Sequence, residues 1–372
     1  MDVTVQLQYL KHLPLYKTVK PLQVTPNFKD RAGKTNVVLE SGPSEVIKDV
    51  RGLECCFELD KHGFKFVKGP TAFTEWSSQP KIAEHYLPEM EELLRREVED
   101  VDEIMFYDAR IRQSGDEGLR VEGLSYNPFA KQVHRDNTDV SCIEKIRNLT
   151  DLKADYLLSG RCRIINIWRP IKHPVYDCSL AVADGSKLQP DDVLECDRHL
   201  ASTGAYHDTM GVIKHRPGFE WYYCSAMAPA DVLLFKNFDS AKHVQAQYCL
   251  HTAFDLPPET IPPSAPPRES IEVRALIFTY PAGQRRPSRT TSSALPSHPL
   301  ARTLTRGQLG QLDDEHTTVI TARVRTDIDE AAEIKDAVLL LRRQEIGDPP
   351  AQRRMRSAGG GARQSQDSSG AG

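Results

Sequence analysis

The chain lacks the sequence features that mark several common protein classes. No stretch approaches the roughly 18 consecutive apolar residues that a membrane-spanning helix needs. The first twenty residues contain Lys11 and Lys17 and no long apolar run, so we expect no secretory signal. The eight cysteines include no pair with C-x-x-C spacing, which argues against a zinc ribbon or a thioredoxin-like site. Without a secretory signal, we expect reduced thiols and a cytoplasmic location.

The chain also lacks an excess of charge of one sign. It carries 48 Lys and Arg residues against 52 Asp and Glu residues, a formal net charge of −4. No basic stripe or polybasic cluster is present, so we expect neither nucleic acid nor an anionic membrane as a partner. The hydrolase motifs H-E-x-x-H and G-x-S-x-G are absent as well. The hydrophobic fraction of 39% nevertheless fits a folded protein.

The composition changes near residue 282, which predicts a domain boundary. From Gln284 onward the chain has no Phe, Tyr or Trp and a single lysine, Lys335. Long stretches of this part are polar or low-complexity, and they bury too little apolar surface to offset chain entropy. We therefore predict a folded domain at 1–281 and a disordered tail at 282–372. One amphipathic helix is expected within the tail, at 327–346.

Within the predicted domain, the apolar pattern places helices early and strands late. The segment 87–100 has leucines on one face and charges on the other, as an amphipathic helix does, and 146–158 also favours a helix. β-branched and aromatic residues predict strands at 161–168, 231–238, 246–254 and 270–280. Helices and strands do not alternate regularly, so a doubly wound sheet is not expected. The pattern favours an α+β protein with a mostly antiparallel barrel or sandwich.

The segment VHRDNT (133–138) contains two candidate metal ligands, His134 and Asp136. Residues two apart in a strand point to the same face, so both side chains could reach one ion. Two histidines and one carboxylate form the facial triad of non-haem iron(II) oxygenases, which leaves positions open for cosubstrate and oxygen. The spacing alone carries little weight, because composition predicts about as many such pairs by chance. A histidine at a strand end beside a surface aspartate is the alternative.

A third ligand would have to come from a histidine further along the chain. Position alone leaves several possibilities open. His251 lies in a strand-like run, and its same-face neighbours Cys249 and Ala253 are small enough to leave room for a metal. The other candidates lie in more polar or breaker-rich segments: His173, His199, His207, His215 and His243.

Two arginines follow His251 in the segment PRESIEVRALIF (267–278): Arg268 and Arg274. A planar guanidinium binds a carboxylate through two hydrogen bonds, so either arginine could hold a dicarboxylate cosubstrate. Arg274 lies inside the apolar run, where an unpaired charge would be costly. It should therefore have an anionic partner, which could equally be an internal carboxylate such as Glu272.

Several ordered segments together resemble one protein family, the fungal 2-oxoglutarate oxygenases. The relatives concerned are gibberellin desaturase, the hydroxylase/desaturases of aspergillic acid-type clusters and the cephalosporin methoxylase component. The resemblance covers about residues 1–281 and leaves out the tail. It is carried by DVRGLE and FELDKHGFKFV (49–67), VHRDNT (133–138), GRCRIINIWRPI (160–171), SLAVAD (179–184), WYYCSAMAPADVLLFKNFDS (221–240), LHTAFDLPP (250–258) and PRESIEVRALIF (267–278).

This resemblance implies a double-stranded β-helix, that is a jelly-roll, cupin-like core with flanking helices. It implies iron(II) on His134, Asp136 and His251. It also implies 2-oxoglutarate on an arginine of the PRESIEVR segment, and position in the core favours Arg274 over Arg268.

The resemblance further suggests which residues line the pocket. Asn166 and Arg169 match the family pattern and would contact cosubstrate or substrate, although Arg169 could instead pin a loop through Asp184. Aromatic residues are candidate walls for an organic substrate, with a place in the core as the alternative, which is favoured for both tryptophans. These aromatic residues are Trp168, Trp221, Tyr222 and Tyr223.

The chain departs from the family pattern at three places. Leu250 replaces the usual proline before the distal histidine, and Ser179-Leu180-Ala181 replaces Pro-Leu-Ala. Glu220 replaces an arginine in the segment before Trp221, which reverses a charge. None of these changes removes a proposed ligand, so activity is expected.

The implied reaction uses Fe(II), 2-oxoglutarate and O2 to hydroxylate, desaturate or cyclise a small organic intermediate of fungal secondary metabolism. Succinate and CO2 are the coproducts. Two other classes use the same residues differently: a zinc-dependent hydrolase and a non-catalytic, cupin-like binding protein. The residues do not specify the substrate, the outcome among the three reactions or the oligomeric state.

Overall fold

A computed structural model describes residues 1–25, 35–113, 129–200 and 206–283. All of them belong to one compact unit, Met1–Ser288. The predicted tail at 282–372 and its helix at 327–346 lie outside the described residues, apart from 282 and 283. No helix in the described ranges is long and apolar enough to cross a membrane.

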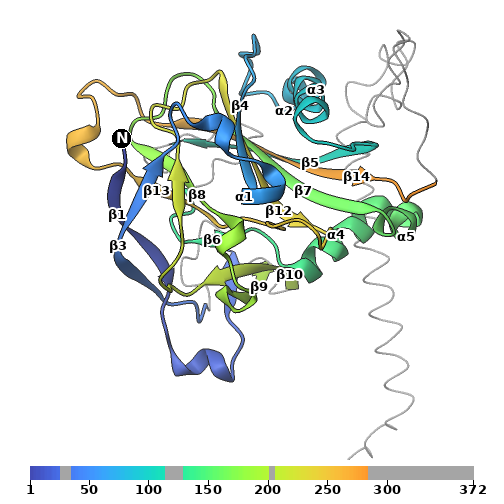
Figure 1. The fold of residues 1–372 in the computed structure, drawn as a ribbon, viewed down its shortest axis with the longest axis horizontal. Helices are drawn as coiled ribbons and strands as arrows, with labels where there is room; N and C mark the ends of the chain where they lie inside the picture. Colours follow the sequence, from blue (N-terminus) through green and yellow to red (C-terminus); the bar gives the residue numbers. More distant parts are fainter. Residues whose placement is uncertain (26–34, 114–128, 201–205, 284–372) are drawn as a thin grey trace, which may run out of the picture. The chain divides into compact units, whose positions relative to one another are not determined.

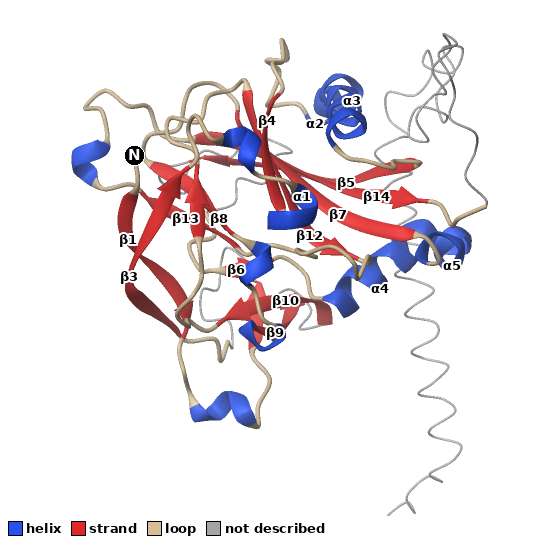
Figure 2. Cartoon of the chain, viewed as in Figure 1, coloured by secondary structure: helices blue, strands red, loops and turns tan. Residues whose placement is uncertain are grey.

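The described residues form two β-sheets, which Figures 1 and 2 show side by side. The larger sheet has nine strands in the order β1-β3-β11-β8-β13-β6-β10-β9-β2, and the smaller has five in the order β4-β12-β7-β14-β5. Neighbouring strands run antiparallel except in the pairs β11–β3 and β2–β9. The strands are β1 Val3–Leu10, β2 Leu22–Thr25, β3 Leu39–Asp49, β4 Phe64–Lys68, β5 Glu103–Gln113, β6 His134–Arg135, β7 Arg161–Pro170, β8 Cys178–Ala183, β9 Val193–Leu200, β10 Tyr206–Ile213, β11 Trp221–Tyr223, β12 Asp231–Asp239, β13 His251–Asp255 and β14 Glu269–Thr279.

One face of the five-stranded sheet is covered by helix α3, Leu87–Glu97, as Figure 1 shows. Apolar residues recur about every three or four positions along α3, at Leu87, Met90 and Leu93–Leu94, so its apolar side faces the sheet. There Leu93 and Leu94 belong to the same buried cluster as Ile165 and Ile167 of β7. The predicted helix at 87–100 is confirmed, but it ends at Glu97 because the backbone turns extended at Val98.

The other face of the five-stranded sheet looks toward the nine-stranded sheet. Side chains alternate across a strand, so Trp168 of β7 lies on the face opposite Ile167. Trp168 packs in one buried cluster with Leu233 and Phe235 of β12 and with Leu180 and Val182 of β8. This cluster joins the two sheets, which places a shared core between them.

Helices α4, Asp139–Thr150, and α5, Ala154–Leu158, pack against the ends of β7 and β14. A single helix at 146–158 was expected, but the chain breaks at Asp151, whose φ of 44° no helix continues. The remaining helical segments are single turns or short 3₁₀ and π turns: α1 Leu59–His62, α2 Gln79–Lys81, the π turn Ile82–Tyr86, and 3₁₀ turns at Pro14–Lys17, Glu54–Cys56, Asp151–Lys153, Gly185–Lys187, Pro190–Asp192 and Pro258–Thr260.

The expected order of helices before strands is wrong, because five strands precede the metal motif. β1 reads VTVQLQYL, an alternation that itself indicates a strand. β3 contains Gly42 and Pro43 and is mostly solvent-facing, so its sequence reads as a loop. The predicted strand at 246–254 is only partly confirmed, because regular pairing begins at His251. The strands predicted at 161–168, 231–238 and 270–280 are confirmed within one or two residues.

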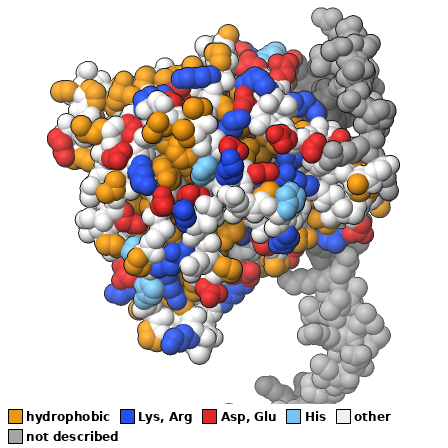
Figure 3. All heavy atoms as spheres, viewed as in Figure 1, with side chains coloured by type: hydrophobic (Ala, Val, Ile, Leu, Met, Phe, Trp, Pro, Cys, Tyr) orange, Lys and Arg blue, Asp and Glu red, His pale blue; other side chains and the backbone are white. Residues whose placement is uncertain are grey.

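On the face drawn in Figure 3, acidic and basic side chains are interspersed, with no large patch of one sign. This surface agrees with the balanced composition of the chain.

The α3 layer should contribute to stability without taking part in chemistry. Replacing the fully buried Leu94 by alanine leaves a cavity between α3 and the sheet, and we expect a loss of about 2–5 kcal/mol in the free energy of unfolding. The exposed Glu92 on the same helix is the matched control, and Glu92→Ala should change stability by less than about 0.5 kcal/mol. Urea denaturation measures both. Equal effects of the two substitutions would contradict the packing role of α3.

Candidate metal centre

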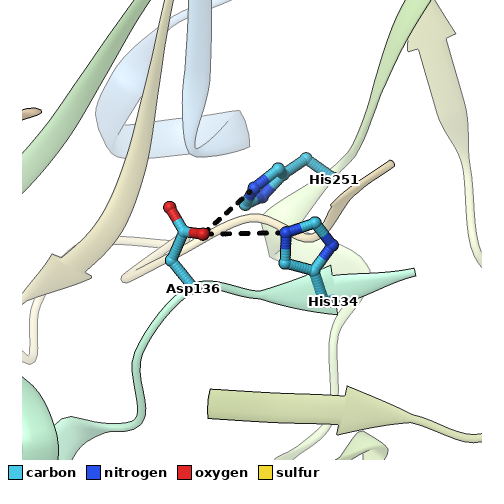
Figure 4. Close-up of side chains that lie close together, drawn as sticks. All are labelled: His134, Asp136 and His251. Atoms are coloured by element: carbon cyan, nitrogen blue, oxygen red, sulfur yellow. Dashed lines mark ion pairs between the residues drawn. The ribbon is translucent and has the colours of Figure 1, made fainter. Parts of the chain in front are cut away.

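Two strands of the nine-stranded sheet bring the predicted ligands together. His134 of β6 pairs directly with His251 of β13, so both side chains leave the same face of the sheet. The centroids of their imidazole rings are 4.2 Å apart. Asp136 follows directly after β6 and turns its carboxylate toward both rings, as Figure 4 shows.

The three side chains offer one ligand atom each to a common point. Oδ1 of Asp136 lies 3.6 Å from Nε2 of His134 and 3.8 Å from Nε2 of His251. These distances are too long for hydrogen bonds, yet the three atoms all lie within 4.8 Å of one another. All three residues are buried. The arrangement leaves room for a single ion between the three atoms.

The orientation of each ring is fixed by its surroundings. Nδ1 of His134 lies 2.8 Å from the carbonyl oxygen of Gln132 and donates to it, so Nε2 is the ring nitrogen left to face a metal. The ring of His251 packs against that of Phe235 at 4.7 Å, and its Nδ1 has no hydrogen-bond partner within the described residues. Both Nε2 atoms are thereby directed at Asp136.

The second oxygen of Asp136 is held by the opposite sheet. Oδ2 accepts hydrogen bonds from Nδ2 of Asn166 at 2.8 Å and from Nδ2 of Asn237 at 3.2 Å. Nη2 of Arg274 lies 3.0 Å from the same oxygen. These residues come from β7, β12 and β14, the three central strands of the five-stranded sheet. The site therefore lies between the two sheets.

The electrostatic surroundings favour the protonation states that a metal requires. Burial alone would raise the pKa of Asp136, but Arg274 and the two imidazoles outweigh it and hold this pKa well below its usual range. Burial, reinforced by His134, lowers the pKa of His251 to about 3. Around neutral pH the site consequently presents a carboxylate and an unprotonated His251.

Arg274 is fully engaged by protein carboxylates. Its Nη2 lies 2.7 Å from Oε1 of Glu272 and 3.0 Å from Asp136, and its Nη1 lies 3.3 Å from Oδ2 of Asp108. Burial would lower the pKa of Arg274, but the neighbouring carboxylates raise it well above its usual value. The internal partner considered from the sequence, Glu272, is confirmed.

Arg268 is equally buried but has a different environment. Its guanidinium donates to the carbonyl oxygen of Cys178 at 2.9 Å and to Oγ of Ser270 at 3.1 Å. It also stacks on the rings of Phe129 and Trp168, at 4.1 Å and 4.9 Å. Within the described ranges it forms no ion pair with a carboxylate, and burial lowers its pKa to about 10. Arg268 is a buried cation that can accept an anionic partner.

Arg169 lies away from the metal centre. It is three residues from Asn166 in β7, so the two side chains leave opposite faces of the sheet. The Arg169 guanidinium lies 5.9 Å from the ring of Tyr86, under the helical layer, and donates to the carbonyl oxygen of Pro229. The expected pocket contact of Arg169 is therefore not found, and Asp184 is not its partner in the described structure.

Two of the four aromatic candidates face away from the metal. Trp221 pairs with Ala183 of β8, and the neighbouring Val182 pairs with His251, so Trp221 leaves the opposite face of the sheet from the ligands. Trp221 and Tyr223 belong to a buried cluster with β1, and the hydroxyl of Tyr223 donates to the carbonyl oxygen of Met1. Both are core residues. For Trp221 this is the alternative that the sequence favoured over a pocket wall.

The other two aromatic candidates lie on the inner side. Tyr222 pairs with Val182 and so shares a face with His251. It is half-buried, and its hydroxyl donates to Glu220 at 3.0 Å. Trp168 is buried against Arg268. These two side chains lie on the inner side, between the two sheets, and Trp168 is part of the buried core there, the alternative favoured from the sequence.

Two of the three departures from the family pattern have local explanations. Glu220 forms an ion pair with Lys48 at 3.0 Å, so the reversed charge has a partner. Leu250 is fully buried in the cluster on the sheet face opposite His251 and leaves the ligands undisturbed. Among the described residues, none of the other candidate histidines joins the group: His173, His199, His207, His215 and His243.

Sequence reasoning missed Asn237 and Asp108. The signal for Asn237 was available, because an uncharged polar residue interrupts the apolar run DVLLFKNF and needs a partner when buried. Asp108 carried no comparable signal.

Comparison with known proteins identifies the relatives of this arrangement. Residues 7–278 match a protein family described as an oxidoreductase/YMDC permease-like domain. The Fe(II)/2-oxoglutarate-dependent dioxygenase nvfI of Aspergillus novofumigatus is 31% identical over 266 residues, which cover 69% of this chain and 89% of the relative. The hydroxylase/desaturase poxK of Penicillium oxalicum is 26% identical over 261 residues, which cover 63% of this chain and 78% of the relative.

A solved structure supports the same relationship. The iron and alpha-ketoglutarate-dependent endoperoxidase NvfI superposes with a TM-score of 0.65 at 26% identity, covering 75% of this chain and 98% of that protein. The chain belongs to this oxidoreductase family and is an Fe(II)/2-oxoglutarate-dependent oxygenase related to fungal enzymes.

Proposed function

We propose that His134, Asp136 and His251 hold the iron(II) of this oxygenase, within a double-stranded β-helix formed by the two sheets. The observation that carries this assignment is that the two carboxylate oxygens of Asp136 have different partners. Oδ1 faces both Nε2 atoms, while Oδ2 accepts hydrogen bonds from the opposite sheet. Two imidazole nitrogens and one carboxylate oxygen fit iron(II). When bound, iron with 2-oxoglutarate and O2 supplies the oxidising power, with succinate and CO2 as coproducts.

We assign 2-oxoglutarate to Arg268, in place of the Arg274 favoured by the sequence. Arg274 is already neutralised by Asp136, Glu272 and Asp108, so it offers no uncompensated positive charge to a ligand. Arg268 is fully buried without an ion pair in the described structure, and a buried cation of this kind is costly unless a ligand supplies the counter-charge. Ser270 stands beside it as a second donor for the same carboxylate.

The remaining residues serve the organic substrate by shape and exclusion of water. Trp168 and the half-buried Tyr222 are proposed walls, whereas the core residues Trp221 and Tyr223 are not. The named relatives are hydroxylase/desaturases and an endoperoxidase, so hydroxylation, desaturation or ring formation on a small molecule is the proposed outcome.

We further propose an oxygenase domain at 1–281, followed by a separate tail at 282–372. The family match ending at residue 278 and the end of the last described strand at Thr279 support this boundary. A reducing, cytoplasmic location is supported by the eight cysteines, all within the described ranges and all free.

The metal ligands can be tested without knowing the substrate. We expect His134→Ala and His251→Ala each to abolish iron(II) binding and the slow, substrate-independent conversion of 2-oxoglutarate to succinate. The exposed His243→Ala is the matched control and should retain both. Equilibrium dialysis with iron(II) and chromatography of succinate measure the outcome. Retained turnover in both ligand variants would contradict the assignment, and iron-independent hydrolysis would favour the hydrolase alternative.

The cosubstrate anchor has a separate test. Arg268→Met should weaken 2-oxoglutarate binding about 100-fold, roughly 3 kcal/mol, because it removes one partner of a buried charge pair. Metal binding should stay normal, and Arg268→Lys should restore part of the affinity. Titration calorimetry of the metal-loaded protein with 2-oxoglutarate gives the dissociation constants. Normal binding in Arg268→Met, with loss only in Arg274→Met, would reinstate Arg274.

The depressed pKa of His251 predicts a pH dependence of stability in the metal-free protein. In the unfolded chain, His251 becomes protonated below the ordinary histidine pKa of about 6.5. In the folded protein, His251 stays unprotonated until the pH falls to about 3. Unfolding is therefore favoured progressively as the pH falls from about 6.5 to 3. His251→Gln should reduce this slope, as measured by urea denaturation at several pH values. An unchanged slope would show that His251 takes up its proton alike in both states.

A further inference from the structure

Asn237 sits at an irregularity in β12. In the pairing of β12 with β7, Lys236 faces Ile165 but Phe238 faces Ile164, so Asn237 is the extra residue of a β-bulge. A bulge turns a side chain out of the regular alternation, and bulges occur frequently beside active sites. The side chain of Asn237 is almost fully buried.

The bulge is tied to the metal motif at two points. Nδ2 of Asn237 donates to Oδ2 of Asp136 at 3.2 Å. The carbonyl oxygen of Asn237 accepts from Nε of Arg135 at 2.9 Å. Arg135 lies between His134 and Asp136 in the sequence, so adjacent residues of the metal motif hold the backbone and the side chain of the same asparagine. Together these contacts close a ring between β6 and β12.

The orientation of the Asn237 amide is set by Asp136. Nδ2 of Asn237 also donates to Oδ1 of Asn166, at 2.7 Å. The Oδ1 atom of Asn237 is buried and has no hydrogen-bond partner within the described residues. Turning the amide over would place that oxygen against two other oxygens, a carboxylate and an amide. The chain tolerates an unpartnered acceptor at this position, which indicates that the N–H toward Asp136 is what matters.

We propose that Asn237 is a positioning residue that restricts Asp136 to metal binding through Oδ1 alone. A carboxylate can bind a metal through one oxygen or two, and binding through both would occupy one of the positions needed for cosubstrate and oxygen. Asn166 and Arg274 reach the same Oδ2, but both also bind Glu272. Asn237 has no carboxylate partner other than Asp136 in the described structure. This inference rests on the proposed metal site.

The test uses Co(II), whose visible absorption reports the number and arrangement of its ligands, on the full-length protein. Asn237→Ala removes the donor, and Asn237→Leu does so while keeping the side-chain volume, in case the alanine variant fails to fold. Asn137→Ala is the matched control, because Asn137 is equally buried but binds Ser141 and Asp208 instead of Asp136. Thermal unfolding of each variant gives its stability.

We expect the Asn237 variants to bind Co(II) about tenfold or more weakly and to show an altered Co(II) spectrum. Asn137→Ala should lose stability but keep the normal spectrum. An unchanged spectrum and affinity in the Asn237 variants would overturn the proposal, and so would the same spectral change in Asn137→Ala. If the unsubstituted protein bound no Co(II), the proposed metal site itself would fail, and the role of Asn237 with it.

Discussion

The two carboxylate oxygens of Asp136 contact different sheets, and the geometry of the site depends on this separation of their roles. Oδ1 faces the histidines of one sheet, and Oδ2 is bound by three donors of the other sheet. A carboxylate this deeply buried would be costly without those donors. The contact therefore joins the sheets, keeps Asp136 ionised and aims the free oxygen. Metal ligation and sheet association share a single side chain.

Charge balance around this contact explains the roles of the two arginines. Arg274 is surrounded by three carboxylates, and removing this arginine would leave their negative charges uncompensated in the interior. Arg268 instead rests among aromatic rings and a carbonyl oxygen. Arg274 is thus compensated by carboxylates of the protein, whereas Arg268 has no carboxylate partner in the described structure and is the proposed anchor for 2-oxoglutarate. The two arginines differ in their side-chain and backbone partners, such as Asp108 for Arg274 and Cys178 for Arg268, and these partners lie far from the arginines in the sequence.

The sequence predicted the parts of the fold whose residues are buried on both sides. β7, β12 and β14 are buried on both faces and rich in β-branched and aromatic residues, and α3 has a clear helical stripe. β6 is only two residues long, so no periodicity could show it. The misplacement of Arg169 was avoidable, because its separation of three from Asn166 puts the two on opposite faces of any strand. The three predicted ligands meet in space, but only the pairing of β6 with β13 shows why.

The β-bulge at Asn237 bears on how this protein can change. Deleting one residue there would restore regular pairing between β12 and β7, which in general favours a more stable sheet. The same deletion would remove the side chain that donates to Oδ2 of Asp136, while Phe238 and Asp239 keep their partners on β7. Selection for a more regular ladder and selection for a working metal ligand therefore oppose each other at this position. At this point of the chain, a more regular and more stable ladder would be obtained only without the amide that contacts Asp136.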